Sequence, residues 1–177
     1  MKNKYIDLIE QTFDFPQDEF SVTNNELNLY DIPLMEIIKQ YGTPLKITYL
    51  PKISAQINRA KRMFNVAMAK VDYRGSYNYC YCTKSNHFSF VLEEALKNDI
   101  HLETSSAYDI HIINALYDGG IIDKDRFIIC NGFKRPQYVE NIAQLINEGF
   151  QNTIPVIDNK EEIDLFDDAI TKKCKVG

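Results

Sequence analysis

The stretch that decides the fold is Tyr77-Asn78-Tyr79-Cys80-Tyr81-Cys82-Thr83-Lys84-Ser85-Asn86, in which tyrosines recur at every second position. Alternation with a period of two predicts a β-strand. One predicted face carries the tyrosines and Thr83, and the other carries small side chains and then Lys84. Bulky aromatics suit packing against helices, whereas small side chains suit the narrow interior of a barrel. Lys84 would then lie at the carboxyl end of a barrel strand, where barrel enzymes place their chemistry. The plain alternative is a lysine that marks where a strand meets solvent.

Strands and helices alternate along the chain on both sides of this stretch. A strand is predicted at 45–50, and a helix at 51–71 with a buried face formed by Ile53, Ile57, Ala60, Phe64, Ala67 and Val71. Later strands are predicted at 100–104, 126–131 and 153–158, and helices at 88–97, 106–117, 135–147 and 160–171. Repeated strand–helix units without hairpin signals predict a parallel sheet, as a barrel or an open wound sheet. The last residues, 174–177, resemble the opening of a sixth strand.

The first 40 residues are the least regular part of the chain. Residues 5–13 could form a short helix, Asn24-Asn25 is a turn signal, and residues 27–30 alternate like a short strand. A helix is predicted to start near Asp31 and Pro33, with Leu34, Ile37 and Ile38 as its buried positions. We therefore treat residues 1–40 as a short, mostly irregular N-terminal segment.

Composition limits the classes of function. Hydrophobic residues make up 45% of the 177 residues and charged residues 25%, which is typical of a globular protein. A formal net charge of -5 argues against a generic nucleic-acid surface. No apolar run is long enough to cross a bilayer and the first ten residues lack a signal-peptide core, so no membrane partner and a cytoplasmic location are predicted. Cys80 and Cys82 do not form a CxxC pair, and no metal site is predicted.

Two segments carry a resemblance to a known family. The hexapeptide Tyr81–Asn86 resembles the Tyr-x-x-Lys-(Ala/Ser)-Asn signature of the alanine-racemase-type, fold-type-III enzymes, which use pyridoxal 5'-phosphate (PLP). In that family the lysine binds the cofactor covalently. Residues 41–45, Tyr-Gly-Thr-Pro-Leu, are similar to the segment that introduces the barrel in fold-type-III decarboxylases. A glycine cap followed by a proline before a strand would explain the second segment without any family.

Two later segments resemble biosynthetic arginine decarboxylases. Residues 101–110 resemble a Leu-Glu-x-x-Ser-x-x-Glu-(Leu/Ile) element, in which Glu103 and Ser106 match and Asp109 replaces glutamate. Ser105 or Ser106 would also cap the next helix. Residues 128–134 resemble Ile-Cys-Asn-Gly-Tyr-Lys, with Phe133 in place of tyrosine; the local alternative is a glycine turn with Lys134 as an exposed charge. Four matches in the family's order, over residues 41–143, favour the resemblance over chance.

The resemblance implies a fold and a function. Residues 41–177 would form about five units of a truncated (β/α)8 barrel that binds PLP, with Lys84 as the catalytic residue and Glu103, Ser106 and Asn131 as further cofactor-binding residues. The full-length protein would be a homodimer that converts arginine to agmatine and CO2, with this chain as its N-terminal, inactive part. The alternatives are decarboxylation of ornithine, lysine or diaminopimelate, a non-catalytic PLP-binding barrel, and an open α/β module in which Lys84 is incidental.

Overall fold

The computed structural model describes residues 19–177, so the helix predicted at 5–13 lies outside the described residues. Contacts divide the chain into two compact units, Met1–Thr48 and Tyr49–Gly177. Each unit is described by itself. No helix in the described part of the chain is long and apolar enough to cross a membrane.

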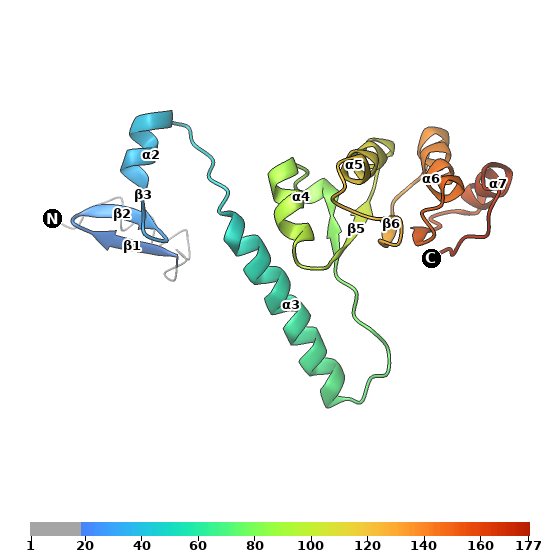
Figure 1. The fold of residues 1–177 in the computed structure, drawn as a ribbon, viewed down its shortest axis with the longest axis horizontal. Coiled ribbons are helices and arrows are strands. Elements are labelled where there is room, and N and C mark those ends of the chain that lie inside the picture. The colour runs from blue at the N-terminus through green and yellow to red at the C-terminus, as the bar shows by residue number, and fades with distance from the viewer. Residues whose placement is uncertain (1–18) are drawn as a thin grey trace. The chain divides into compact units, whose positions relative to one another are not determined.

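In its described residues, 19–48, the first unit contains a small antiparallel sheet followed by one helix (Figure 1). Its elements are β1 (Phe20–Thr23), β2 (Glu26–Leu29), β3 (Ile32–Pro33) and α2 (Leu34–Tyr41). Asn24 and Asn25 have φ angles of 53° and 64°, as a two-residue hairpin turn requires, so the predicted turn is confirmed. Residues 20–41 are therefore more regular than the sequence suggested. The predicted buried face of α2 is only half-buried.

The strand predicted at 45–50 is absent, which is a correction to the sequence prediction. Gly42 does end α2: its N–H still donates to the Ile38 carbonyl at 2.8 Å, and its φ of 78° then turns the chain out of the helix. Residues 45–49, however, form no regular element, and the next helix already begins at Leu50. An extended segment becomes a strand only where a neighbouring strand pairs its N–H and C=O groups. No strand of the described chain pairs with residues 45–48.

The second unit is built on a four-stranded parallel sheet in the order β4-β5-β6-β7. Its strands are β4 (Cys80–Cys82), β5 (His101–Thr104), β6 (Ile128–Cys130) and β7 (Thr153–Pro155). Its helices are α3 (Leu50–Lys70), α4 (Ser89–Leu96), α5 (Ala107–Asp118), α6 (Pro136–Glu148) and α7 (Lys160–Ala169). The predicted strand–helix alternation and parallel pairing are confirmed. The Gly177 N–H donates to the Pro155 carbonyl and its carbonyl accepts from Ile157, each at 3.0 Å, as expected where a further strand opens beside β7.

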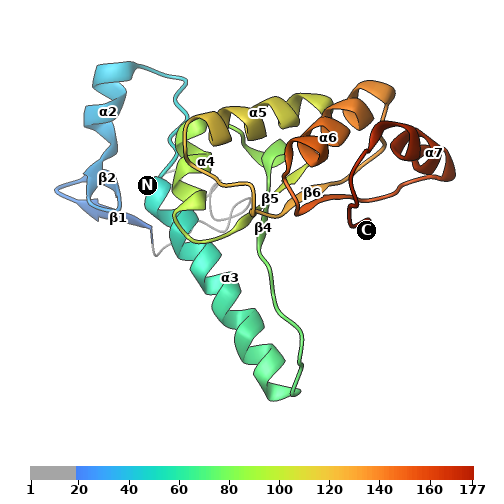
Figure 2. The same cartoon turned by 45° about the vertical axis from the view of Figure 1, so that its right-hand side comes forward.

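Helices cover one face of this sheet and leave the other largely uncovered. Alternate strand residues such as Leu102, Ile128 and Cys130 are completely buried against helical residues that include Ile113 and Ile142. Helices α4 to α7 lie in a row along the sheet in both ribbon views (Figures 1 and 2). On β5, β6 and β7 the other alternate residues are only half-buried. This is the arrangement of a partial barrel, with its outer layer formed and its inner face open.

The strand predicted within residues 77–86 is shorter than expected, but the side of it that was predicted to face the helices does so. Only residues 80–82 pair as β4. Tyr79 and Tyr81 pack against the core and Thr83 is buried, as expected for the helix-facing side. Tyr77 instead stacks on Phe64 of α3, with 4.2 Å between ring centroids.

The predicted buried face of α3 is correct only near its N-terminal half. Ile57 is the buried residue of this helix, and Ile53 packs partly against the core. Phe64 is 52% exposed, and Val71 just beyond the helix is 74% exposed. The reason is positional: α3 packs on α4, and its C-terminal half runs past the sheet (Figure 1), where the Tyr77 ring stacks on Phe64 but does not bury it.

Candidate functional site

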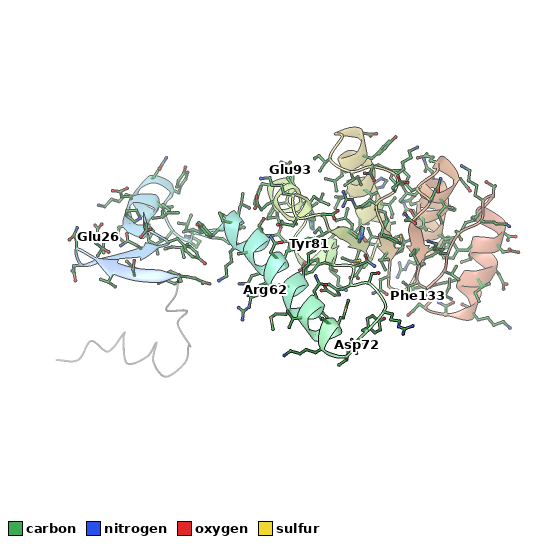
Figure 3. All side chains as sticks on the ribbon, turned by 60° about the horizontal axis from the view of Figure 1, so that its bottom comes forward. Glu26, Arg62, Asp72, Tyr81, Glu93 and Phe133 are labelled. Atoms are coloured by element: carbon green, nitrogen blue, oxygen red, sulfur yellow. The ribbon has the colours of Figure 1, made fainter. Side chains whose placement is uncertain are left out.

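Lys84 lies at the carboxyl end of β4, in a short 3₁₀ turn (Thr83–Ser85) rather than in the strand itself. Buried Thr83 anchors this turn, because its hydroxyl donates to the Glu103 carbonyl on β5 at 3.1 Å. The Ser85 hydroxyl closes the turn by donating to the Cys82 carbonyl at 2.6 Å. The Tyr81 hydroxyl fixes the following residues by donating to the Asn86 carbonyl at 2.9 Å (Figure 3 labels Tyr81). The turn is thus held on both sides while Lys84 is exposed.

Glu103 lies on the neighbouring strand and faces the same side of the sheet as Cys80 and Cys82. The pairing register places Cys82 opposite Glu103. Burial raises the pKa of the Cys82 thiol, and the charge of Glu103 raises it further, whereas Lys84 lowers it. Burial followed by the same carboxylate also raises the pKa of Cys80. Glu103 on β5 and Lys84 just after β4 therefore lie at the carboxyl ends of neighbouring strands.

Asn131 joins Glu103 from the third strand. Its side-chain Nδ2 donates to Glu103 Oε1 at 3.3 Å, and its backbone N–H donates to the Thr104 carbonyl at 2.9 Å. Its Oδ1 accepts from the Gly132 N–H at 2.9 Å, in a turn where Gly132 has a φ of 76°. A φ in this range favours glycine, which explains the glycine at this position. Three of the four residues predicted for the site therefore lie at the carboxyl ends of β4, β5 and β6, and Asn131 and Glu103 are in contact.

Ser106 has a structural task that the sequence predicted. It is the N-cap of α5, and its hydroxyl accepts from the Asp109 N–H at 3.4 Å. Asp109 is buried, and its carboxylate accepts from the Ser105 N–H at 2.8 Å. The Ser106 side chain thus binds the backbone N–H of Asp109, and the Asp109 side chain binds the backbone N–H of Ser105, in the manner of a capping box. This pairing gives Asp109 a physical role, and the spacing Ser-x-x-Asp was the signal that could have revealed it.

The local alternative for residues 128–134, in which Lys134 is an exposed charge, is wrong. Its side chain is fully buried and pairs with Glu162 of α7 at 3.2 Å. Its ammonium also donates to the Gly132 carbonyl at 2.7 Å and to the Val156 carbonyl. Three acceptors thus surround a group that has three donors. Lys134 is therefore fully bonded, in contrast with the exposed Lys84.

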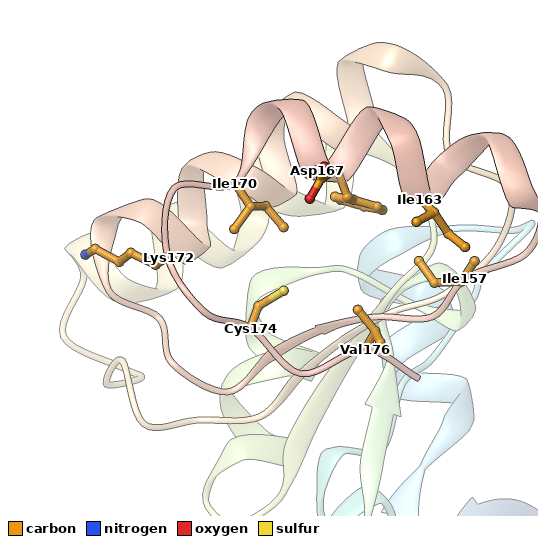
Figure 4. A pocket seen from close by; sticks show the side chains of 8 residues that line it. Ile157, Ile163, Asp167, Ile170, Lys172, Cys174 and Val176 are labelled. Carbon is orange, nitrogen blue, oxygen red and sulfur yellow. The ribbon is translucent and has the colours of Figure 1, made fainter.

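Other candidate groups lie apart from this site. His87 is exposed, and no group of three His, Cys, Asp or Glu side chains within residues 19–177 could hold a metal ion. An apolar pocket of about 310 Å³ lies between α7 and the C-terminal segment (Figure 4). Its lining is Ile157, Ile163, Phe166, Asp167, Ile170, Lys172, Cys174 and Val176. None of the four predicted site residues belongs to it, so we place the site at the strand ends.

The fold is that of a class of decarboxylases. The biosynthetic arginine decarboxylase of Campylobacter jejuni superposes with a TM-score of 0.69, with 19% identity, over 99% of this chain and 30% of that one. Diaminopimelate decarboxylase of M. jannaschii gives the same TM-score with 16% identity, over 86% of this chain and 32% of that one. The chain is thus part of a (β/α)8 barrel, and the predicted fold class is confirmed.

Within that class, the proteins whose sequences are similar to this chain are arginine decarboxylases. The biosynthetic arginine decarboxylase of Nostoc is 30% identical over 145 residues, which cover 78% of this chain and 20% of that protein. Arginine decarboxylase of Glycine max is 26% identical over 159 residues, which cover 81% of this chain and 22% of that protein. No family model matches. The predicted resemblance is confirmed, and the chain spans about a fifth of the length of these curated relatives.

Proposed function

We propose that this chain forms part of a PLP-dependent decarboxylase that converts arginine to agmatine and CO2. The observation that carries the proposal is the placement of Lys84, Glu103 and Asn131 at the carboxyl ends of three neighbouring parallel strands, in a chain homologous to arginine decarboxylases. Barrel enzymes build their sites at this edge. Ser106 is a weaker member of the proposed site, since its hydroxyl caps α5.

The donor set at this edge fits PLP, whose aldehyde requires a primary amine. Lys84 offers an exposed amine, whereas the amine of Lys134 is buried and fully bonded to oxygen atoms. Glu103 and Asn131 offer a carboxylate and an amide that can bind polar substituents of the cofactor. We propose that Lys84 holds PLP covalently and that Glu103 and Asn131 orient it. When bound, PLP supplies an electron sink for the carbanion left when a bond to Cα breaks.

The neighbouring side chains support this assignment of roles. Asn131 Nδ2 holds Glu103 Oε1 and thereby fixes the carboxylate beside the sheet edge. Burial and Glu103 raise the pKa of both Cys80 and Cys82, which keeps these thiols protonated at neutral pH. A protonated thiol is a poor nucleophile, so neither cysteine competes with Lys84 for the cofactor.

The choice of arginine rests on the curated relatives, which are named arginine decarboxylases. Diaminopimelate is the second candidate substrate, because a diaminopimelate decarboxylase superposes with the same TM-score as an arginine decarboxylase. A non-catalytic PLP-binding barrel is the remaining alternative. We further propose, from the resemblance alone, that the complete protein is a cytoplasmic homodimer; a monomer in light scattering at assay concentration would contradict the dimer.

A substrate series tests this proposal. We expect the complete protein, supplied with PLP, to release labelled CO2 from carboxyl-labelled arginine. Release from ornithine, lysine and diaminopimelate should be slower by about tenfold or more in kcat/KM, because none of them carries a guanidinium and polar groups built to pair with one would be left unpaired. A preference for diaminopimelate would replace arginine by the second candidate. No release from any of the four, with PLP bound, would favour the non-catalytic barrel.

A further inference from the structure

The buried ion pair between Lys134 and Glu162 connects the β6–α6 loop to the start of α7, at the same edge of the sheet as the proposed site. Lys134 lies in the loop between β6 and α6, and Glu162 lies in the first turn of α7. Their side chains are 0% and 1% exposed. A charged pair removed from water in this way is costly, and an apolar pair of similar volume is often as stable. The presence of charge here therefore calls for a reason other than stability.

Glu162 binds both loops through several donors. One carboxylate oxygen accepts from the Lys134 N–H at 2.8 Å, and the other accepts from the Asp158 N–H at 3.1 Å. The Asn159 side chain caps α7 by accepting from the Glu162 N–H at 3.2 Å, and its own Nδ2 donates back to Glu162 Oε1. Burial alone would raise the pKa of Glu162, but hydrogen bonds from the N–H groups of Lys134 and Asp158 and the Lys134 ammonium lower it. The carboxylate is thus ionised at neutral pH and can hold the ammonium.

A continuous series of contacts leads from this pair to the proposed site. The Lys134 ammonium donates to the Gly132 carbonyl at 2.7 Å. The N–H of Gly132 donates to Asn131 Oδ1 at 2.9 Å, which orients the amide of Asn131. Asn131 Nδ2 then donates to Glu103 Oε1 at 3.3 Å. Each link fixes the next, so the position of the Glu103 carboxylate depends on the turn that Lys134 holds.

We propose that Lys134 and Glu162 are positioning residues of this site: their buried ion pair fixes the Asn131–Gly132 turn and through it the contact between Asn131 and Glu103. This inference rests on the proposed function for its catalytic consequence, whereas the anchoring of the turn stands on the contacts alone. Neither residue is among those proposed to hold the cofactor, and the side-chain partners of Lys134 are Gly132, Val156 and Glu162. Groups that support a site in this way are needed to hold it within a fraction of an ångström of its working geometry.

The test compares Lys134→Met, Asn131→Ala and the double variant with the wild-type complete protein. We expect Lys134→Met to lower kcat by about 10- to 100-fold, because small displacements of positioned groups have effects of that size. If Lys134 acts through Asn131, the double variant should lie within about threefold of Asn131→Ala, since coupled residues are not additive. Losses that multiply in the double variant would overturn the proposal.

A second readout follows the turn itself and does not depend on activity. We expect the peptide that covers residues 128–135 to exchange its amide hydrogens about tenfold faster in Lys134→Met than in the wild type, because the turn loses its anchor. Lys97→Met is the matched control, since it removes an exposed ion pair with Glu94 and should change neither kcat nor exchange in this peptide. Unchanged exchange in Lys134→Met would overturn the anchoring.

Two further measurements separate the outcomes. If Lys134→Met fails to fold, Lys134→Met/Glu162→Gln leaves no unpaired carboxylate and keeps an amide oxygen that can accept from the backbone N–H of residue 134 or 158, so it should fold and still show fast exchange in residues 128–135. Wild-type exchange in that folded double variant would overturn the proposal. A wild-type protein without decarboxylase activity would defeat the proposed function, and the exchange experiment would still decide whether the pair anchors the turn.

Discussion

Replacement of Lys84 by alanine should abolish decarboxylation by the complete protein. The exposed amine of Lys84 is the group proposed to hold PLP, and the methyl group of alanine cannot form that bond. We expect kcat to fall by a factor on the order of 10³ or more, as is found when a covalent nucleophile is removed. Covalent attachment of PLP, measured by absorbance before and after borohydride reduction, should be lost as well.

Controls for this variant come from the same chain. Lys97→Ala removes another exposed lysine, one that pairs with Glu94 on α4, and should retain both PLP and activity. Thermal melting should show that Lys84→Ala is folded, because the turn around residue 84 is held by Thr83 and Ser85 rather than by the lysine. Substantial arginine turnover by Lys84→Ala would show that the proposed role of this residue is wrong.

The 177-residue chain, expressed by itself, should associate or be loosely packed and should lack decarboxylase activity. The inner face of its sheet carries half-buried apolar residues, among them Ile129, Ile154 and Val156. Full burial of a side chain of this size contributes about 1.5–3 kcal/mol, whereas the net stability of a domain is only about 5–15 kcal/mol. The outer backbone edge of β4 is also left without a strand partner among the described residues, and such edges promote association.

Two measurements on the same sample check this expectation. Light scattering should show species larger than a monomer, and thermal unfolding should be broad rather than sharply cooperative. A reversible, sharp transition of a monomer that produces agmatine from arginine would mean that the chain is a complete enzyme. In that case the inference that this chain is inactive by itself, drawn from its similarity to part of a barrel, would be wrong.

The repeated units were predictable from the sequence because local pattern and tertiary environment agree there. On α4, the four predicted positions Val91, Leu92, Ala95 and Leu96 are all buried, since this helix has a core-facing side within the described fold. Glu103 was expected on the face of β5 that does not carry Leu102 and Thr104, and the alternation of burial along β5 confirms this. Where a helix or strand finds its neighbour within the chain, its periodicity is sufficient.

Two elements could not be predicted from local pattern, for the same physical reason. The segment at 45–50 has a strand-like sequence, but no strand of the described chain is paired with residues 45–48. The C-terminal half of α3 has an apolar face, yet Phe64 remains 52% exposed. Periodicity reports which face of an element is apolar, whereas burial also requires a partner surface.

The ion pair between Lys134 and Glu162 was missed for a different reason. Its members are 28 residues apart and meet only because β6 and β7 are neighbours in the sheet. The spacing of Asn159 and Glu162 is a recognisable helix start, but it gives no indication that the carboxylate also binds a lysine from the preceding loop. The site residues Lys84, Glu103 and Asn131 were identified from resemblance, and the sheet register places them at the same end of the sheet.

The most direct measurement of the central claim is the position of the cofactor on the chain. The complete protein is incubated with PLP, reduced with borohydride and digested, and the modified lysine is located by mass spectrometry. We predict a single dominant adduct on Lys84 and none on Lys134, whose amine is buried among three oxygen acceptors. An adduct on any other lysine, or no adduct while the protein decarboxylates arginine, would contradict the account.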